Sequence, residues 1–234
     1  MPETVEQNPI LAHRAEIFYP SSTEEREIIY PEQREDDMGE TSIHITLVTN
    51  FLSVLKLFLK ERKDVFLSAN MNLYYEEANP NKWYAPDILI AFGVPDHERS
   101  SYQIWNEKVS PQVIFEVSYE RTWKVDISEK LEIYGQLGVE EYYILDPEFA
   151  YLPAPILAFH RQGERLLTAT VDNERIFSPH LGLEIVRTEN DFRLFDPKIG
   201  SFLLTLEESE DKRQKVETEL KNLKAEIEKL RAGK

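Results

Sequence analysis

The stretches DILIAF at residues 87–92 and QVIFEVS at 112–118 decide the fold class of this chain. Both are rich in β-branched and aromatic residues, which indicates strands, and their unbroken apolar runs are typical of strands buried on both faces. Similar short runs at 65–69, 71–75 and 141–146 predict further strands. Because a sheet that is buried on both faces needs a cover on each side, we predict an α/β fold with a mixed central sheet flanked by helices.

Two helical patterns can supply that cover. Residues 42–61 carry apolar side chains at steps of three and four, with Thr41 or Ser42 as the N-cap; the stripe consists of Ile43, Leu47, Phe51, Leu55 and Phe58. A second helix is predicted over 126–137, with Gly135 and Gly138 as its C-terminal stop. We expect the two helices to lie on opposite faces of the sheet.

The end of the chain differs from the rest. Four short apolar runs within 156–204 predict antiparallel strands that extend the central sheet. Beyond them, apolar residues follow the 4, 3, 4, 3 spacing of a coiled-coil heptad, at Val216, Leu220, Leu223, Ile227 and Leu230. We therefore expect an acidic N-terminal arm at 1–40, a domain at 41–206 and a C-terminal heptad helix at 207–234. The helix predicts a homodimer, with 216–230 in the contact. Because an isolated pair of about two and a half heptads would be marginal, the helix is expected to add to a dimer contact made elsewhere or to pack on another surface, and a solvated terminal helix is the alternative.

The composition of the 234 residues excludes several classes of protein. With 41% hydrophobic and 11% aromatic residues the chain can bury a sizeable core, so it is not a disordered protein. No apolar run approaches the roughly 18 residues of a membrane span, so no membrane segment is expected. The acidic start MPETVEQNPI and the absence of cysteine favour a protein of the reducing cytoplasm, without a signal peptide or a disulfide framework.

The charge distribution argues against tight, nonspecific binding to nucleic acid. The formal net charge is −16, and residues 1–40 alone hold 11 acidic and 3 basic residues. Proteins that bind the phosphate backbone tightly usually present a basic surface, because phosphate contacts release counterions. A divalent cation bound in an acidic cleft would reverse the local field where a phosphate sits.

Several kinds of active site are absent from the sequence. It has only 8 glycines, and it contains neither the phosphate-binding loop G-x-x-x-x-G-K-[ST] nor the dinucleotide fingerprint G-x-G-x-x-G. The five histidines are scattered, which disfavours a zinc site, and no G-x-S-x-G serine elbow occurs. Two strand-borne acids and a lysine beyond them remain as candidates.

Asp87 opens one predicted strand, and Glu116 lies inside the apolar run of another. An unpaired charge there would be very costly, so Glu116 needs a partner. If the two strands pair, Asp87 lies beside it, and two carboxylates form an oxygen site suited to Mg²⁺ or Mn²⁺, with the Val117 carbonyl as a third ligand. The structural alternatives are backbone hydrogen bonds for Asp87 and a buried salt bridge for Glu116.

Lys130 borders the apolar stripe of the helix predicted at 126–137, so it can reach the sheet. A lysine near a metal-bound water can orient that water or help to deprotonate it, and the metal lowers the pKa of the water. These parts suit metal-assisted hydrolysis of a phosphodiester. Lys124 and Lys108 are alternatives for the same role, and a solvated lysine on a helix face is the structural alternative.

Three segments resemble the Uma-type family of restriction-endonuclease-like proteins, within the PD-(D/E)XK nuclease superfamily. They are Pro-Asp at 86–87, VIFEVS at 113–118 and DISEKLEIYGQLGVEEYYILDP at 126–147. The resemblance implies that Asp87 and Glu116 bind the metal. The superfamily lysine usually follows the acid by two positions, where this chain has Ser118. Family members look as though this lysine has moved to the following helix, which Lys130 fits, and Glu40 is a candidate for an additional acid.

Two functions follow from the resemblance. The first is a Mg²⁺-dependent endonuclease that hydrolyses DNA, and the second is a catalytically inactive binding or regulatory dimer that keeps the nuclease fold. Fold by itself does not decide between them. A group of aromatic residues could stack on bases or belong to the core: Trp83, Tyr84, Trp105, Trp123, Tyr142 and Tyr143.

Overall fold

A computed structural model describes residues 41–189 and 191–232, and its centre is a six-stranded sheet in the order β1-β4-β6-β7-β8-β9. The strands are β1 (Val65–Ala69), β4 (Ile88–Phe92), β6 (Val113–Val117), β7 (Glu141–Leu145), β8 (Ile156–Gln162) and β9 (Arg165–Thr168). β6 and β7 run parallel, whereas the other neighbouring pairs are antiparallel. The sheet is therefore mixed, as the sequence predicts. The predicted acidic arm at 1–40 and Glu40 lie outside the described residues.

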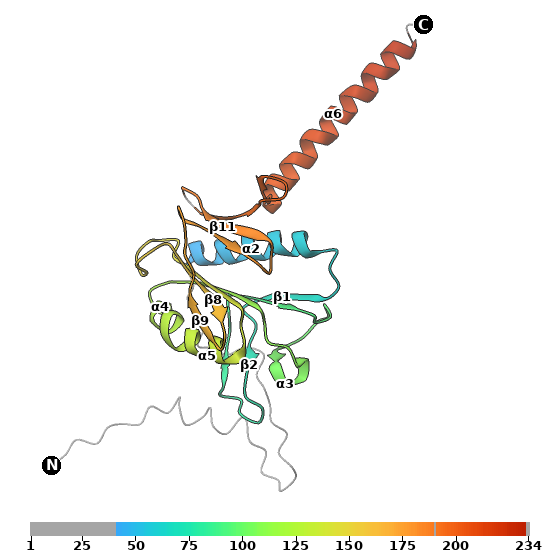
Figure 1. Cartoon of the computed structure of the whole chain (residues 1–234). Helices are drawn as coiled ribbons and strands as arrows, with labels where there is room; N and C mark the ends of the chain where they lie inside the picture. Colours follow the sequence, from blue (N-terminus) through green and yellow to red (C-terminus); the bar gives the residue numbers. More distant parts are fainter. Residues whose placement is uncertain (1–40, 190, 233–234) are drawn as a thin grey trace, which may run out of the picture.

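Helices cover the two faces of this sheet (Figure 1). α2 (Ser42–Leu59) packs on one face in a core that includes Phe51, Ile90 and Phe115. The other face is covered by the continuous helical segment formed by α4 (Trp123–Val125), a π-helical turn η2 (Asp126–Lys130) and α5 (Leu131–Leu137). The predicted α/β architecture with helices on opposite faces is confirmed. The first turn of the helix predicted at 126–137 is a π-turn, a local widening that is frequent at functional sites.

The buried face of α2 is rotated from the predicted stripe. Ile43 and Phe58 are 48% and 36% exposed, whereas His44 is 2% exposed and points into the protein. Thr41 caps the helix, since its hydroxyl accepts a hydrogen bond from the His44 N–H at 3.2 Å. The reason for the rotation is polar: turning His44 inward brings its ring to Asp87 at the end of β4.

α2 also corrects the expectation that no segment resembles a membrane span. Within the described residues it is the one helix long and apolar enough to cross a membrane, with a mean hydropathy of 1.6. Seven of its side chains are buried against the rest of the chain. Packing between two sheets accounts for the apolar residues on the sides of α2 that meet protein, and 39% of the helix is buried inside the structure.

The C-terminal strands only partly extend the central sheet. β8 and β9 join it, but the following strands form a separate antiparallel sheet, which lies on the other side of α2 (Figure 1): β10 (Arg175–Ser178), β11 (Leu183–Arg187), β12 (Phe192–Asp196) and β13 (Ser201–Phe202). Ile185 and Leu194 share a core with Leu55 of α2. The prediction that all these strands extend one sheet is wrong, since the exposed side of the apolar α2 needed a cover of its own.

A third, small sheet contains the strand predicted at 71–75. Its order is β3-β2-β5, formed by β2 (Leu73–Tyr74), β3 (Trp83–Tyr84) and β5 (Tyr102–Gln103), and β5 is followed by the short helix α3 (Ile104–Glu107). The segment is therefore a strand of this sheet and not of the central one.

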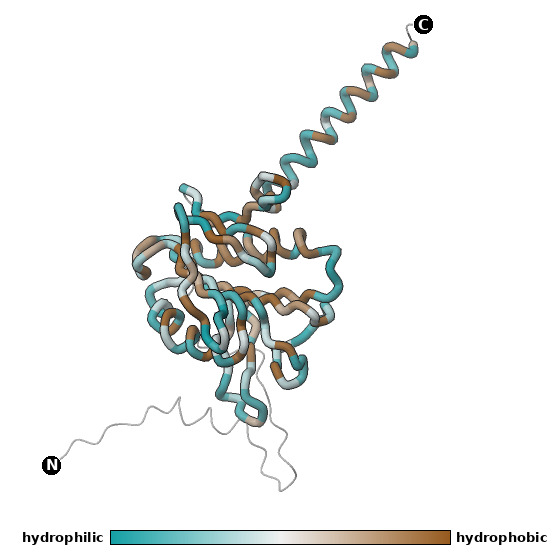
Figure 2. Tube along the Cα trace, viewed as in Figure 1, coloured by the Kyte–Doolittle hydropathy of each residue, from teal (hydrophilic) through white to brown (hydrophobic). Residues whose placement is uncertain are grey.

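The last element, α6 (Leu206–Ala232), projects away from the sheets (Figures 1 and 2). None of its residues is buried. It is a single continuous helix over the segment where the heptad pattern occurs, and it begins next to the predicted boundary at 206–207.

Candidate active site

The pairing of β4 with β6 brings the two predicted acids together. Ile88 lies opposite Phe115 and Leu89 opposite Ile114, so the register continues to Asp87 and Glu116 at the ends of the strands. Asp87 Oδ2 accepts a hydrogen bond from the Val117 N–H at 2.6 Å, and the Asp87 amide nitrogen lies 3.5 Å from Glu116 Oε2. The two carboxylates are therefore neighbours at one end of the strand pair.

The π-turn delivers Lys130 to this pair together with a further acid. Lys130 Nζ lies 3.0 Å from Glu116 Oε2 and 2.8 Å from Asp126 Oδ1. The ammonium group thus bridges two carboxylates, one from the sheet and one from its own helical segment. Asp126 was not among the predicted site residues. Its four-residue spacing from Lys130 in DISEK, which places both on one side of a helix, was the available signal.

Three further side chains, from α2, α5 and β7, contact the site residues. His44 Nε2 lies 3.1 Å from Asp87 Oδ1, and the Tyr134 hydroxyl donates to Glu116 Oε1 at 2.9 Å. The Tyr142 hydroxyl donates to the Asp126 backbone carbonyl at 2.9 Å. Sequence reasoning missed the site roles of His44 and Tyr134, although both are polar residues on otherwise apolar helix stripes.

The site group, which comprises Asp87, Glu116, Asp126 and Lys130, holds more negative than positive charge. The exposed fractions of these four residues are 8%, 2%, 1% and 8%. Burial, with Asp87 and Asp126 adding to it, raises the pKa of Glu116 well above its usual range although Lys130 opposes the shift. Burial also raises the pKa of Asp126. Burial therefore favours the protonated forms of Glu116 and Asp126 over their charged forms.

The three carboxylates of the site group also shift the pKa of Lys130. Burial alone would lower it, but the carboxylates of Glu116, Asp126 and Asp87 outweigh burial and raise the pKa above its usual range. Lys130 is therefore a firmly charged ammonium at neutral pH.

The chemistry of the site group fits a hard divalent cation, although its geometry is not a ready-made cage. Its donors are carboxylate oxygens, which Mg²⁺ and Mn²⁺ prefer. Within residues 41–189 and 191–232, no three His, Asp or Glu side chains already enclose a space for a metal ion. The Lys130 ammonium between Glu116 and Asp126 explains this. Mg²⁺ is usually held by one or two carboxylates and keeps several waters, so the pair Asp87 and Glu116 suffices in number.

The other predicted candidates lie elsewhere. Ser118, at the position of the usual superfamily lysine, is 1% exposed, and its hydroxyl makes no hydrogen bond within the described part of the chain. Lys108 and Lys124 are exposed, and neither forms an ion pair with a described acid, whereas Lys130 is buried in the site group.

The six aromatic residues do not form one stacking platform. Tyr142 and Tyr143 are 0% exposed and point to opposite faces of β7, into two different cores. Tyr84 packs edge-on against Tyr134 at 6.0 Å between ring centroids.

A surface cavity of about 970 Å³, lined in part by Lys56, Lys60 and Arg99, contains none of the site group.

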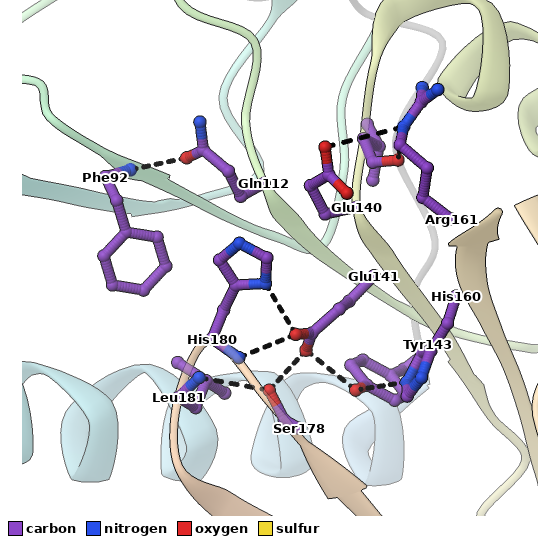
Figure 3. Close-up of polar contacts among 11 residues, drawn as sticks. Phe92, Gln112, Glu140, Glu141, Tyr143, His160, Arg161, Ser178, His180 and Leu181 are labelled. Atoms are coloured by element: carbon purple, nitrogen blue, oxygen red, sulfur yellow. Dashed lines mark hydrogen bonds and ion pairs between the residues drawn. The ribbon is translucent and has the colours of Figure 1, made fainter. Parts of the chain in front are cut away.

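A buried carboxylate outside the site group, absent from the sequence predictions, lies at the start of β7 (Figure 3). Glu141 is 2% exposed and accepts hydrogen bonds from the hydroxyls of Ser178 and Tyr143. Its Oε1 also accepts from the His180 backbone N–H at 2.7 Å and lies 2.7 Å from His180 Nδ1. His160 Nε2 is 3.0 Å from the Tyr143 hydroxyl. Glu141 thereby ties the end of β10 and the residues after it to the central sheet.

Comparisons with known proteins bear on the family. A solved structure described as "a putative nuclease belonging to DUF820 from Anabaena variabilis ATCC 29413" is 12% identical in sequence. The match covers 61% of this chain and 75% of that one, with a TM-score of 0.44. No curated protein matches the chain. The family model Uma2, described as "Putative restriction endonuclease", matches residues 25–188, which include the whole site group. The chain therefore belongs to the Uma2 family.

Proposed function

We propose that this protein is a metal-dependent endonuclease that hydrolyses phosphodiester bonds of DNA. In this proposal Asp87 and Glu116 hold Mg²⁺ or Mn²⁺, with the Val117 carbonyl as a further ligand. The observation that carries the proposal is the convergence of Asp87, Glu116 and Lys130 in one buried group, in which three carboxyl groups surround a single ammonium group. Membership of a family described as restriction endonucleases supports the reaction class.

Each residue of the site group has a part in this reaction. A bound divalent ion would supply Lewis acidity, lowering the pKa of a water and neutralising charge on the phosphate. Lys130 stays protonated, because its pKa is raised, so it orients the attacking water and stabilises negative charge without accepting a proton. Asp126 positions Lys130 through their ion pair at 2.8 Å.

The surrounding hydrogen bonds keep the acids in one arrangement. The Val117 N–H and His44 hold the two oxygens of Asp87, and Tyr134 holds one oxygen of Glu116. Such preorganisation matters because a catalytic group that is displaced by about 1 Å loses much of its effect.

A catalytically inactive binding or regulatory dimer with the nuclease fold is the second candidate. The observation that favours it is that Lys130 is already paired with both Glu116 and Asp126, as in a purely structural ion-pair network. The acidic net charge of −16 also fits a protein that does not grip the DNA backbone tightly.

A cleavage assay separates the two candidates. The full chain is incubated with plasmid, duplex and single-stranded oligonucleotides, and RNA in Mg²⁺, Mn²⁺ or EDTA. We expect metal-dependent cleavage of DNA that is lost in Asp87→Asn and Glu116→Gln. The controls are Glu132→Gln and Lys124→Gln, which alter exposed residues on or beside the same helical segment. Cleavage that survives both site variants would indicate a contaminant, and absence of cleavage with every substrate would favour the inactive dimer.

We also propose that the chain forms a homodimer through α6, because the apolar heptad residues of that helix are exposed.

A reducing cytoplasm is the proposed location, since a chain with no cysteine cannot form the disulfides that an oxidising compartment allows.

A further inference from the structure

The heptad residues of α6 form an apolar stripe, comprising Val216, Leu220, Leu223, Ile227 and Leu230, that no described part of the chain covers. Their exposed fractions lie between 48% and 68%, although they are among the most apolar residues of the helix. The stripe runs along a helix that projects from the rest of the molecule (Figure 2). An apolar surface of this shape is typical of a helix that pairs with another helix.

The charged residues beside the stripe favour a second copy of the same helix, in the parallel orientation, as its partner. Leu220 and Ile227 occupy heptad positions a, and Val216, Leu223 and Leu230 occupy positions d. The flanking g positions are Lys212, Glu219 and Glu226, and the e positions that follow them are Glu217, Lys224 and Arg231. In a parallel pair of identical helices, each g residue meets the e residue five positions later on the other helix. All three such pairs join opposite charges: Lys212 with Glu217, Glu219 with Lys224, and Glu226 with Arg231.

Antiparallel pairing of two copies is only partly favourable in charge. In that orientation, g residues meet g residues and e residues meet e residues. With Leu220 opposite Leu223, Glu217 faces Lys224 of the other copy, an attractive pair, but Glu219 faces Glu226, a repulsive one. Moving the register by one heptad in either direction brings Glu226 against its own counterpart or Glu219 against its own counterpart. Each antiparallel register that retains most of the apolar stripe therefore contains a repulsive glutamate pair, whereas the parallel one contains none.

We propose that α6 pairs with α6 of a second copy as a parallel, in-register, two-stranded coiled coil. Ile227 at position a and Leu223 and Leu230 at positions d agree with two strands, whereas Leu220 at a and Val216 at d do not add to this preference. The inference deepens the homodimer proposed above by assigning its orientation, and it does not depend on nuclease activity.

The start of α6 is attached to the domain by hydrogen bonds. The way in which two α6 helices pair therefore sets how the two domains are oriented. Thr205 and Glu208 form a capping box, in which the Thr205 hydroxyl accepts from the Glu208 N–H at 3.2 Å and Glu208 Oε2 accepts from the Thr205 N–H at 2.9 Å. Arg193 of β12 donates to the same Glu208 oxygen at 2.6 Å. A parallel coiled coil therefore holds the two domains, and both copies of the site group, at the same end of the assembly.

Charge variants test the pairing of Glu219 with Lys224, neither of which makes an ion pair within the described residues. We expect Lys224→Glu to weaken dimerisation of the full chain about tenfold, since it replaces two attractive pairs per dimer by two repulsive ones. Glu219→Lys combined with Lys224→Glu should restore it. Lys221→Glu is the matched control, because it makes the same charge change outside the seam. The measurement is sedimentation equilibrium over a range of concentrations. A monomer at every concentration, or equal weakening by Lys221→Glu, would overturn the proposal.

Cysteine cross-linking tests the orientation. The chain has no cysteine, so Leu230→Cys introduces a single thiol at a d position near the end of the helix. Parallel in-register helices bring the two thiols together, and mild oxidation should give a disulfide-linked dimer. Ala225→Cys, on the outer side of the helix, should not cross-link. A dimer in which Leu230→Cys fails to cross-link would be antiparallel or out of register, which contradicts the proposal.

Discussion

Glu116 and Glu141 are two buried glutamates on neighbouring parallel strands, yet their surroundings differ completely. Glu116 lies near the end of β6 and shares its space with two other acids and one ammonium group. Glu141 lies at the start of β7 and is surrounded by hydroxyls, a backbone N–H and a histidine ring. Both are 2% exposed. Burial is therefore the same for the two carboxylates, and the balance of charge around them is what differs.

The largest expected difference between the two glutamates is in catalysis. We expect Glu116→Gln to reduce DNA cleavage at least about 100-fold, because in the proposed reaction the Glu116 carboxylate holds the metal ion. Glu141→Gln, which lies outside the site group, should stay within a few-fold of the wild type. Initial rates of plasmid cleavage at saturating Mg²⁺ measure both, with circular dichroism to check folding. Equal losses in the two variants would contradict a special role for Glu116.

Stability should show the opposite order. Glu141→Ala leaves the hydroxyls of Ser178 and Tyr143 and the His180 N–H without their acceptor, which should lower the free energy of unfolding by about 3 kcal/mol. In metal-free protein, Glu116→Gln should change stability little or raise it, because it relieves repulsion among three acids. Urea unfolding in EDTA measures both. A strongly destabilised Glu116→Gln would identify Glu116 as a structural partner of Lys130.

The next largest expected effect is the stabilisation of the site group by a divalent ion. At about 100 times its dissociation constant, Mg²⁺ or Mn²⁺ would stabilise the wild type by about 2.7 kcal/mol, which is a rise of several degrees in Tm. We expect Asp87→Asn to abolish this rise and Glu132→Gln, on the exposed side of α5, to keep it. Thermal unfolding with and without metal makes the comparison, and Ca²⁺ and Na⁺ serve as ion controls. A rise that persists in Asp87→Asn would locate the ion elsewhere.

The smallest expected effect is in the pH dependence of the metal-free protein. Burial raises the pKa of Glu116 well above the ordinary 4.5, so the folded state binds that proton more tightly than the unfolded chain does. The resulting stability is fully present below about pH 4.5 and is lost as the pH rises through the raised pKa. Asp126 contributes with the same sign. Urea midpoints in EDTA at successive pH values should fall less steeply for Glu116→Gln than for wild type, and identical slopes would contradict this origin.

Much of the fold could be predicted because burial leaves a local pattern. The apolar runs of β4 and β6 required a sheet covered on both faces, and the periodicity of α2 predicted one cover. The separate sheet β10–β13 could not be predicted, since a short strand carries no information about which strand it pairs with. That choice depended on the uncovered side of α2, a long-range requirement.

The candidate site was predictable in part for the same reason. A glutamate inside an apolar strand needs a partner, so the sequence predicts a polar site at Glu116. Asp87 is predicted to lie beside it if the two strands pair. Asp126 and His44 were missed because their polar side chains lie on helices, where polar residues usually face solvent. The π-turn at 126–130 and the rotation of α2 turn them inward, and neither is visible in a periodicity of 3.6 residues.

The sequence by itself determined the buried strands, the helical segments between them, the heptad stripe and its flanking charges, because each is written in residues close together along the chain. Only the tertiary structure decided how charges are balanced. Asp87, Glu116 and Asp126 are separated in sequence, and they meet because β4 pairs with β6 in one register and a π-turn places Lys130 between Glu116 and Asp126. Electrostatic energy depends on distance through space and on burial, and neither quantity exists before the chain folds.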